Sequence, residues 1–152
     1  MLKLMYITNS PEVASIADGA GVDRIFIDLE QYGKEKRQKN WDSVKSKHSI
    51  SDIPKVKSAV KNAQIFVRTD PIFDGFSDEL EGVLACEPDV VMLPYFKTVR
   101  EVETFIKAVD GRATTSLLLE TREAAEQIDD IISVGGIDEI HIGLNDLSHS
   151  YG

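Results

Sequence analysis

Short apolar runs alternate with amphipathic segments along the whole chain. The runs are rich in Ile, Val, Leu and Phe, which is typical of strands in a parallel sheet that is buried on both faces. Between them, apolar residues recur at helical spacing, most clearly at Val99, Val102, Phe105, Ile106 and Val109. The pattern predicts strands at 2–7, 23–30, 64–71, 89–96, 113–120 and 137–144.

Capping residues mark where the intervening helices begin and end. Ser10 is a suitable N-cap, with Pro11 at the first helical position and Gly19 or Gly21 at the end of the helix. Ser51 is a second plausible cap, and Pro54 is tolerated because it falls in the first turn. The predicted helices cover residues 10–21, 51–63, 77–87, 98–111 and 121–136.

Six strand–helix steps with short connections predict an α/β fold. Two architectures fit: a doubly wound open sheet, or part of a (β/α)₈ TIM barrel. A complete barrel takes about 250 residues, whereas this chain has 152, which is room for about six of the eight units. In the barrel interpretation, residues 1–152 form a single partial domain without strands seven and eight. A polar stretch at 31–49 is longer than most loops, and such loops are often functional.

Composition narrows the classes of function. The chain has 17 Lys and Arg against 26 Asp and Glu, a net charge of −9, which argues against nucleic acid or an anionic membrane as the main partner. No apolar run approaches the roughly 20 residues that cross a bilayer, and the N-terminus lacks the features of a signal peptide. With Cys86 as the single cysteine, we expect a cytoplasmic protein.

Polar side chains gather where the predicted strands end. In both candidate folds the carboxyl ends of the strands meet at one face, and functional residues cluster there. Carboxylates at the ends of three strands, together with an arginine at the end of another, form the most specific part of this pattern. The residues are Asp28, Glu30, Arg68, Asp70, Lys97, Glu120, Asn145 and Asp146.

The carboxylates and the arginine each allow two interpretations. Glu120 and Asp146 would suit a hard divalent cation such as Mg²⁺ or Mn²⁺ if they converge, or each would favour the N-terminus of the next helix. Arg68 has the fixed fork of donors that suits a carboxylate or an enolate oxygen. It would equally suit an ion pair with a neighbouring acid, namely Asp28, Glu30 or Asp70.

Five segments together resemble the HpcH/HpaI aldolase and citrate lyase β-subunit family, which belongs to the phosphoenolpyruvate/pyruvate-binding TIM barrels. Their order and spacing match over nearly the whole chain, and "LLLETREA" followed about 25 residues later by "IGLNDLS" is the most specific pair. The segments are "IFIDLE", "IFVRTDP", "DVVMLPYFKTVREVETF", "LLLETREAAEQIDDI" and "GIDEIHIGLNDLS".

The resemblance implies a metal-dependent lyase or aldolase that makes or cleaves a C–C bond next to a 2-oxo acid or an acyl-CoA. It implies that Glu120 and Asp146 bind Mg²⁺ or a similar ion and that Arg68 steadies a pyruvate-like enolate. It also implies that backbone N–H groups around Asn145 and Asp146 receive the substrate carboxylate. An enolate is the costly intermediate of aldol cleavage, and a cation and a guanidinium at its oxygen lower that cost.

The second-strand motif departs from the aldolases. They usually have a proton-transferring His after the acid, where this chain has Gln31, and Gln transfers no proton at neutral pH. The Lys34 and Arg37 that follow resemble the citrate-lyase branch. His48, in the same polar stretch, has the side chain type whose pKa suits proton transfer, and a metal-bound water is the other candidate for the base.

An incomplete barrel would leave its first and last strands as open edges. We therefore expect the sequence to be a fragment of a longer product; a short protein that completes its barrel by association, or an inactive open sheet, are the alternatives. A complete barrel is expected to form a homo-oligomer, as family members often do. Because Gln31 replaces the histidine, a non-catalytic pseudo-enzyme or assembly partner is the second hypothesis for function.

Overall fold

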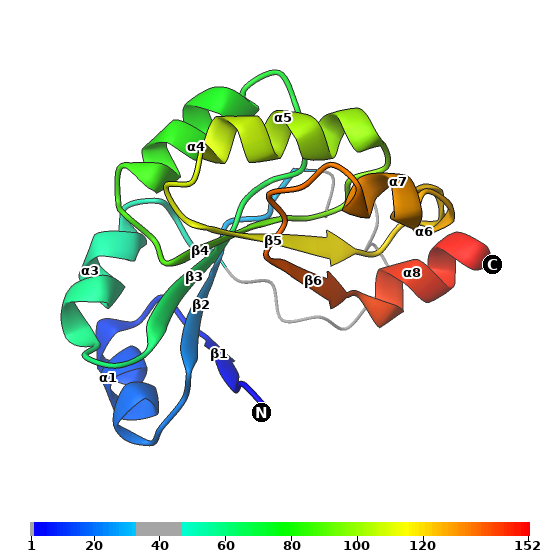
Figure 1. Ribbon diagram of the computed structural model, residues 1–152. Coiled ribbons are helices and arrows are strands. Elements are labelled where there is room, and N and C mark those ends of the chain that lie inside the picture. Colours follow the sequence, from blue (N-terminus) through cyan, green and yellow to red (C-terminus); the bar gives the residue numbers. More distant parts are fainter. Residues whose placement is uncertain (1, 33–46) are drawn as a thin grey trace.

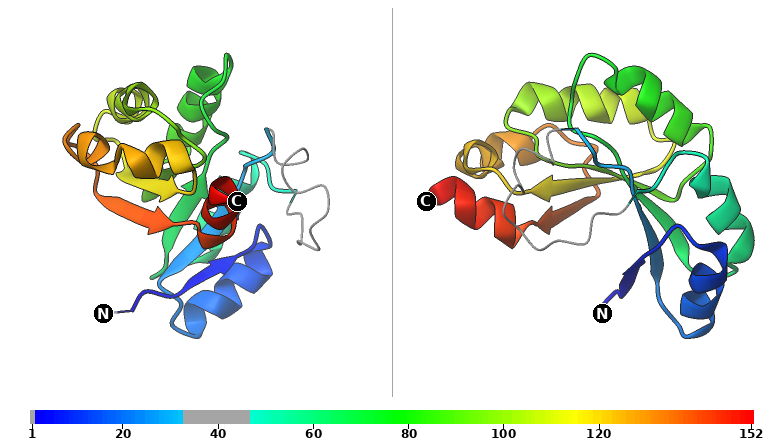
Figure 2. Two further views of the ribbon diagram at one scale, coloured as in Figure 1. Left: turned by 90° about the vertical axis from the view of Figure 1, so that its right-hand side faces the viewer. Right: turned by 180° about the vertical axis from the view of Figure 1, so that it is seen from behind.

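The structure is a computed structural model that describes residues 2–32 and 47–152. Six parallel strands lie side by side in chain order, from β1 at one edge to β6 at the other. The sheet curls strongly and the helices cover mainly its outer, convex side, so the architecture is an open half-barrel (Figures 1 and 2). The strands are β1 (Met5–Ile7), β2 (Arg24–Asp28), β3 (Gln64–Arg68), β4 (Val90–Leu93), β5 (Thr114–Leu119) and β6 (Glu139–Ile142).

A helix follows each strand, which confirms the predicted α/β fold and the partial TIM barrel. The doubly wound alternative is wrong, because a sheet of that kind does not run in simple chain order from one edge to the other. The helices are α1 (Pro11–Gly19), α3 (Asp52–Ala59), α4 (Phe76–Leu84), α5 (Val99–Val109), α6 (Arg122–Glu126), α7 (Ile128–Ile132) and α8 (Leu144–Tyr151).

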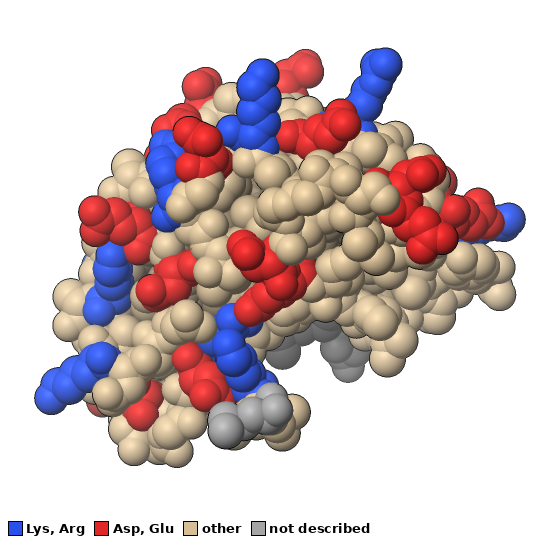
Figure 3. Space-filling model, in the orientation of Figure 1, with Lys and Arg blue, Asp and Glu red and all other residues tan. Residues whose placement is uncertain are grey.

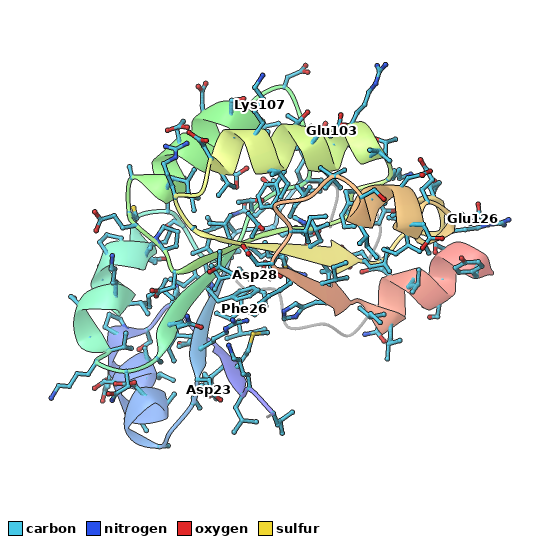
Figure 4. The ribbon with its side chains drawn as sticks, in the orientation of Figure 1. Asp23, Phe26, Asp28, Glu103, Lys107 and Glu126 are labelled. Carbon is cyan, nitrogen blue, oxygen red and sulfur yellow. The ribbon has the colours of Figure 1, made fainter. Side chains whose placement is uncertain are left out.

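The two faces of the sheet carry separate apolar clusters. Side chains alternate between faces along a strand, so Ile25 and Ile27 of β2 pack in the large cluster beneath the helices. Phe26, between them, belongs to a smaller cluster with Phe66, Val90 and Met92. Figure 4 shows Phe26 and Asp28 within the curve of the sheet, with Glu103 projecting outward from α5. The concave side is therefore the inside of the barrel.

The prediction of one helix over 121–136 is wrong. Helix α6 ends at Glu126, and α7 begins at Ile128. Between them Gln127 has a non-helical φ of −113° and ψ of 18°. Its side-chain amide donates to the carbonyl oxygens of Lys97 at 3.2 Å and Glu123 at 2.9 Å. This tertiary contact with the segment before α5 fixes the break, and the 3.6-residue pattern does not reveal it.

Two further expectations about helix ends need correction. The sixth strand, predicted to reach residue 144, ends at Ile142, and the "GLNDLS" segment, for which no helix is predicted, provides the N-cap Gly143 and the first turns of α8. Ser51 makes no capping hydrogen bond to α3. The carboxylate of Asp52 instead accepts the N–H of Ser49 at 3.0 Å, which ties the chain before the helix. Ser10 does cap α1, through a 3.4 Å bond from the N–H of Val13.

The two outer strands are the least covered part of the sheet. Within the described residues, β1 pairs with β2 alone and β6 with β5 alone. Apolar side chains of both strands are exposed, including Met5 and Ile7 of β1 and Ile140 and Ile142 of β6. None of the helices in the described ranges is long and apolar enough to span a membrane. On the face in Figure 3, acidic and basic side chains are interspersed rather than gathered by sign.

Candidate active site

Arg68 is fixed by two acids at the carboxyl end of β2. Its Nε and Nη2 donate to the two carboxylate oxygens of Asp28 at 2.9 and 2.8 Å, and Nη2 lies 3.3 Å from Oε2 of Glu30. Strands β2 and β3 pair with Asp28 opposite Arg68, so the alignment of the sheet creates this contact. Nη1 makes no hydrogen bond to any described residue, which leaves one donor of the fork for a ligand.

The acids around Arg68 dominate its electrostatics. Burial disfavours the guanidinium charge, but the hydrogen bond to Asp28 and the charges of Asp28, Glu30 and Glu120 outweigh it and raise the pKa of Arg68. Arg68 therefore does form ion pairs with Asp28 and Glu30, as the structural alternative for this arginine predicts. The pair and a ligand at Nη1 use different nitrogens, so the two roles are compatible.

Glu120 is a buried acid at the end of β5. Only 4% of the residue is exposed, and its Oε1 accepts the backbone N–H of Tyr95 at 3.0 Å. Burial, then the negative charges of Glu30 and Asp146, raise its pKa from 4.5 to about 7, against the opposing effects of Arg68 and of the Tyr95 N–H. The structure thus brings together Arg68 at the end of β3, Glu120 directly after β5 and Asp146 in the first turn of α8.

Helix capping does not explain Glu120. The N-cap of α6 is Thr121, whose hydroxyl accepts the N–H of Ala124 at 3.2 Å, so the acid before it is left to face the concave side. Asp146 does lie in the first turn of α8, where an acid is stabilised by the helix dipole. The capping alternative therefore applies to Asp146 alone.

The charge balance of the site fits a divalent cation. Asp28 and Glu30 share Arg68, whereas neither Glu120 nor Asp146 forms an ion pair within 2–32 and 47–152. Two carboxylates close enough to perturb each other, one of them buried, form a donor set of the kind that Mg²⁺ and Mn²⁺ prefer. The described residues contain no group of three or more His, Cys, Asp or Glu side chains arranged for a metal. Mg²⁺ commonly takes one or two protein carboxylates and completes its shell with waters and substrate oxygens.

The start of α8 presents backbone donors near these acids. Asn145 is exposed and Asp146 is half-buried. The N–H groups of Leu144, Asn145 and Asp146 lie in the first turn, where helix geometry leaves them without an intrahelical acceptor. Gly143 offers no side-chain cap. These donors suit a carboxylate ligand, in line with the predicted contact from Asn145 and Asp146.

His48 lies at the same end of the barrel, beside β2. The residue is buried, with 7% exposed, and its Nδ1 accepts the backbone N–H of Asp28 at 2.9 Å. A ring nitrogen that accepts carries no proton, so the neutral ring has its proton on Nε2. His48 therefore acts as a base only if this hydrogen bond opens or the tautomer changes.

Gln31 has a structural part in the segment after β2. Its side-chain amide donates to the carbonyl oxygen of His48 at 3.4 Å. Its backbone N–H and that of Tyr32 donate to Oδ1 of Asp70 at 2.6 and 2.7 Å. Asp70 thereby anchors this segment to the end of β3 and does not pair with Arg68. Lys34 and Arg37 lie outside the described residues.

Sequence reasoning missed the backbone of Tyr95. Its φ of 49° places it in the left-handed region, which few residues other than glycine adopt. The preceding Pro94 marks the end of β4, but no residue type in this segment signals that the next N–H would bind Glu120. Such a contact depends on how two neighbouring strand ends meet in space.

The family model for HpcH/HpaI aldolase/citrate lyase matches residues 3–152. Among solved structures, the chain is similar to an HpcH/HpaI aldolase from Desulfitobacterium hafniense DCB-2, with a TM-score of 0.73 and 16% identity over 99% of this chain and 65% of that one. It is similar to the citrate synthase SbnG, with a TM-score of 0.76 and 19% identity over 99% of this chain and 63% of that one. It is also similar to macrophomate synthase, with a TM-score of 0.74 and 14% identity over 99% of this chain and 57% of that one.

These similarities establish the fold of this chain, and they cover only part of each of the other structures. The chain spans about two thirds or less of the length of each structure named above. No curated protein sequence matches it. The match to the family model covers nearly every residue, including the ends of all six strands. The chain belongs to the HpcH/HpaI aldolase/citrate lyase family.

Proposed function

We propose that the protein is a metal-dependent carbon–carbon lyase of the aldolase or citrate-lyase type. Its substrate would be a 2-oxo acid, or a related acyl-CoA, that gives a pyruvate-like enolate when the bond next to the carbonyl group breaks. Family membership and the similarity to an aldolase, a citrate synthase and macrophomate synthase support this class of reaction.

One observation carries the proposal. A guanidinium with one unused nitrogen, Arg68, faces a buried acid, Glu120, whose pKa is raised to about 7 by burial and by the charges of Glu30 and Asp146. Acids under such repulsion are stabilised when a cation joins them, and perturbed pKa values of this kind gather at functional sites.

Glu120 and Asp146 would hold the cation. When bound, Mg²⁺ or Mn²⁺ would supply Lewis-acid stabilisation of negative charge on the carbonyl oxygen of the substrate. Oxygen donors of this type do not discriminate between the two ions, so either is expected to serve. Asp28 and Glu30 would remain with Arg68, since both already contact its guanidinium.

Arg68 would stabilise the enolate. In retro-aldol cleavage a base removes the hydroxyl proton of the substrate, the C–C bond breaks, and its electron pair moves onto the carbonyl oxygen of the pyruvate-like part. Nη1 of Arg68 is the donor that remains for this oxygen, because Nε and Nη2 are held by Asp28. Such a fixed donor costs no reorganisation during the reaction, which is the condition for effective electrostatic catalysis.

The N-terminus of α8 would receive the substrate carboxylate. Its first-turn N–H groups, at Leu144, Asn145 and Asp146, adjoin the same acids that would hold the cation. His48 is the candidate for proton transfer in the described part of the chain, with the condition that Nδ1 is released from the Asp28 N–H. Gln31 is neither an acid nor a base at neutral pH, and its side-chain amide would position His48 by donating to the backbone carbonyl oxygen of that residue.

The non-catalytic alternative rests on the same two residues. Gln31 stands where the aldolases have a histidine, and the Nδ1 of His48 is occupied. If no other group supplies a base, the site would bind its ligand and not turn it over. A test must therefore follow proton removal itself and not only binding.

Deuterium exchange into the methyl group of pyruvate provides that test, since it requires enolate formation and no knowledge of the second substrate. We expect ¹H NMR to show exchange that depends on Mg²⁺. Arg68→Lys should slow it by about 10- to 100-fold, because lysine keeps the charge and loses the fork. Arg112→Lys is the matched control, because Arg112 is exposed and contacts only Glu81 and the carbonyl oxygens of Ala108 and Val109 in the described structure.

A parallel experiment with acetyl-CoA distinguishes the two branches of substrate. Exchange into pyruvate alone would indicate the aldolase branch, and exchange into acetyl-CoA the acyl-CoA branch. If neither compound exchanges while Mg²⁺ still binds, the lyase proposal is overturned in favour of the non-catalytic one.

A further inference from the structure

The carboxylate of Glu120 is held between two loops. On one side, its Oε1 accepts the backbone N–H of Tyr95, the first N–H donor after β4 because Pro94 has none. Tyr95 adopts a φ of 49°. Left-handed backbone at a residue other than glycine is sparsely populated and persists only where its surroundings enforce it, often at functional sites.

The surroundings of Tyr95 do enforce this conformation. The hydroxyl of Thr121 donates to the carbonyl oxygen of Phe96 at 2.7 Å, and the amide of Gln127 donates to that of Lys97 at 3.2 Å. Three successive residues after β4 are thus tied through their backbone to the segment that contains Glu120. Each of these hydrogen bonds limits the movement of Tyr95 relative to Glu120, and so limits the movement of the Glu120 carboxylate.

On the other side, Glu120 is packed against Gly143. A Cβ added at Gly143 would lie 2.8 Å from the Cβ of Glu120 and 2.9 Å from its Oε2. Real Cβ contacts of this length essentially never occur, and the Cβ of Glu120 is fixed by the backbone of β5. Gly143 has a φ of −85°, which any residue can adopt. Glycine is therefore required at this position because a larger side chain has no room, and not because the backbone conformation excludes other residues.

We propose that Tyr95 and Gly143 are positioning residues that hold the Glu120 carboxylate in the orientation for binding the cation. The Tyr95 N–H fixes Oε1, and the missing side chain at Gly143 leaves room for Oε2 beside the segment that leads to Asp146. This inference rests on the proposed metal-dependent function and goes beyond it, because it assigns roles to a backbone group and to an absent side chain.

Mn²⁺ affinity of the purified protein, measured by electron paramagnetic resonance, tests the role of Gly143. We expect Gly143→Ala to weaken Mn²⁺ binding at least tenfold, since the methyl group displaces Oε2. Gly19→Ala is the matched control, because a Cβ at Gly19 meets nothing within 4 Å. The melting temperature without metal shows whether each variant remains folded.

Tyr95 variants separate its backbone from its side chain. Tyr95→Gly and Tyr95→Phe should bind Mn²⁺ within about twofold of the parent, since both keep the N–H and tolerate or retain the left-handed backbone. Tyr95→Val should weaken binding about tenfold, because a β-branched residue resists positive φ. Rescue by glycine is an outcome that a packing role of the ring would not produce.

The outcomes distinguish the two proposals. If the parent binds Mn²⁺ and Glu120→Gln abolishes binding, but Gly143→Ala and Tyr95→Val bind as the parent does, the positioning roles are overturned and the metal centre stands. If the parent itself binds no Mn²⁺, the metal centre is overturned and the positioning roles fall with it.

Discussion

Arg24 and Glu139 form a bidentate ion pair that joins β2 to β6 across the concave side of the sheet. Nη1 and Nη2 of Arg24 donate to the two carboxylate oxygens of Glu139 at 2.7 and 2.5 Å. Three strands separate β2 from β6 in the sheet, so the contact exists only because the sheet curls. The Arg24 side chain is 4% exposed and lies over the ring of Phe66.

Removing one member of this pair should destabilise the fold. Glu139→Gln leaves a buried guanidinium without its counter-charge, and we expect a loss of about 3 kcal/mol in the free energy of unfolding. Urea denaturation measures it. Glu81→Gln, which breaks the exposed pair with Arg112, should cost far less, because water and salt screen an exposed ion pair. Equal losses in the two variants would show that the buried pair stabilises the fold no more than an exposed one.

Asp28 should govern the activity of Arg68 without contacting the substrate. Asp28→Asn removes the charge that holds Nε and Nη2, so we expect the exchange rate of pyruvate to fall about tenfold through kcat. Asp18→Asn is the structural control. Its carboxylate binds the backbone N–H groups of Lys61, Asn62 and Ala63 at the amino end of β3. That variant should lower stability and leave kcat unchanged; a fall in kcat there too would argue against a specific role for Asp28.

Glu79 should make stability fall as the pH rises. Burial raises the pKa of Glu79 from 4.5 to about 7, against the hydrogen bond from the backbone N–H of Asp70 and with a small further contribution from the Asp70 charge. Its Oε2 is buried without a hydrogen-bond partner in the described structure. Between these two pH values the folded state binds more protons than the unfolded state, so the free energy of unfolding declines from about pH 4.5 to pH 7 and then levels off.

Glu79→Gln isolates this contribution. The pKa of Glu120 is also raised, so both acids contribute to the decline in the free energy of unfolding. Glu79→Gln should therefore remove only part of this decline, on the order of 2 kcal/mol. Urea midpoints at pH 5 and pH 8 measure the difference. A decline as steep in Glu79→Gln as in the parent would mean that Glu79 titrates normally.

Much of the fold follows from the sequence because it depends on local pattern. The apolar runs around Ile27, Val67 and Val91 specify buried parallel strands, and helical spacing specifies α5. The break at Gln127 and the helix at Leu144–Tyr151 do not follow, since one depends on a contact with Lys97 and the other begins without a capping side chain.

The candidate site divides in the same way. Asp28, Arg68, Glu120 and Asp146 could be found because parallel strands deliver their carboxyl ends to one edge. The pairing of Arg68 with Asp28 rather than Asp70 could not, because it depends on the register of β2 and β3. The hydrogen bond from Tyr95 to Glu120 involves the backbone, which every residue shares, so no residue type announces it.

Cation affinity should depend on pH through Glu120. A cation binds the ionised acid and competes with its proton. With a pKa of about 7, Glu120 is mostly protonated at pH 6 and mostly ionised at pH 8. Mn²⁺ affinity should therefore fall by roughly tenfold from pH 8 to pH 6, as calorimetric titration would show. An affinity that stays constant over this range would mean that Glu120 is not the acid that titrates with binding.

The most direct test of the account is the thermal shift produced by Mn²⁺ with pyruvate. The melting temperature of the parent should rise, because a ligand that binds the folded state stabilises it. Glu126→Gln should respond equally, since Glu126 is exposed, pairs with Arg122, and lies away from Asp28 and the concave side (Figure 4). Glu120→Ala and Asp146→Ala should show no shift. A full shift in both of these variants would contradict the metal site and the function built on it.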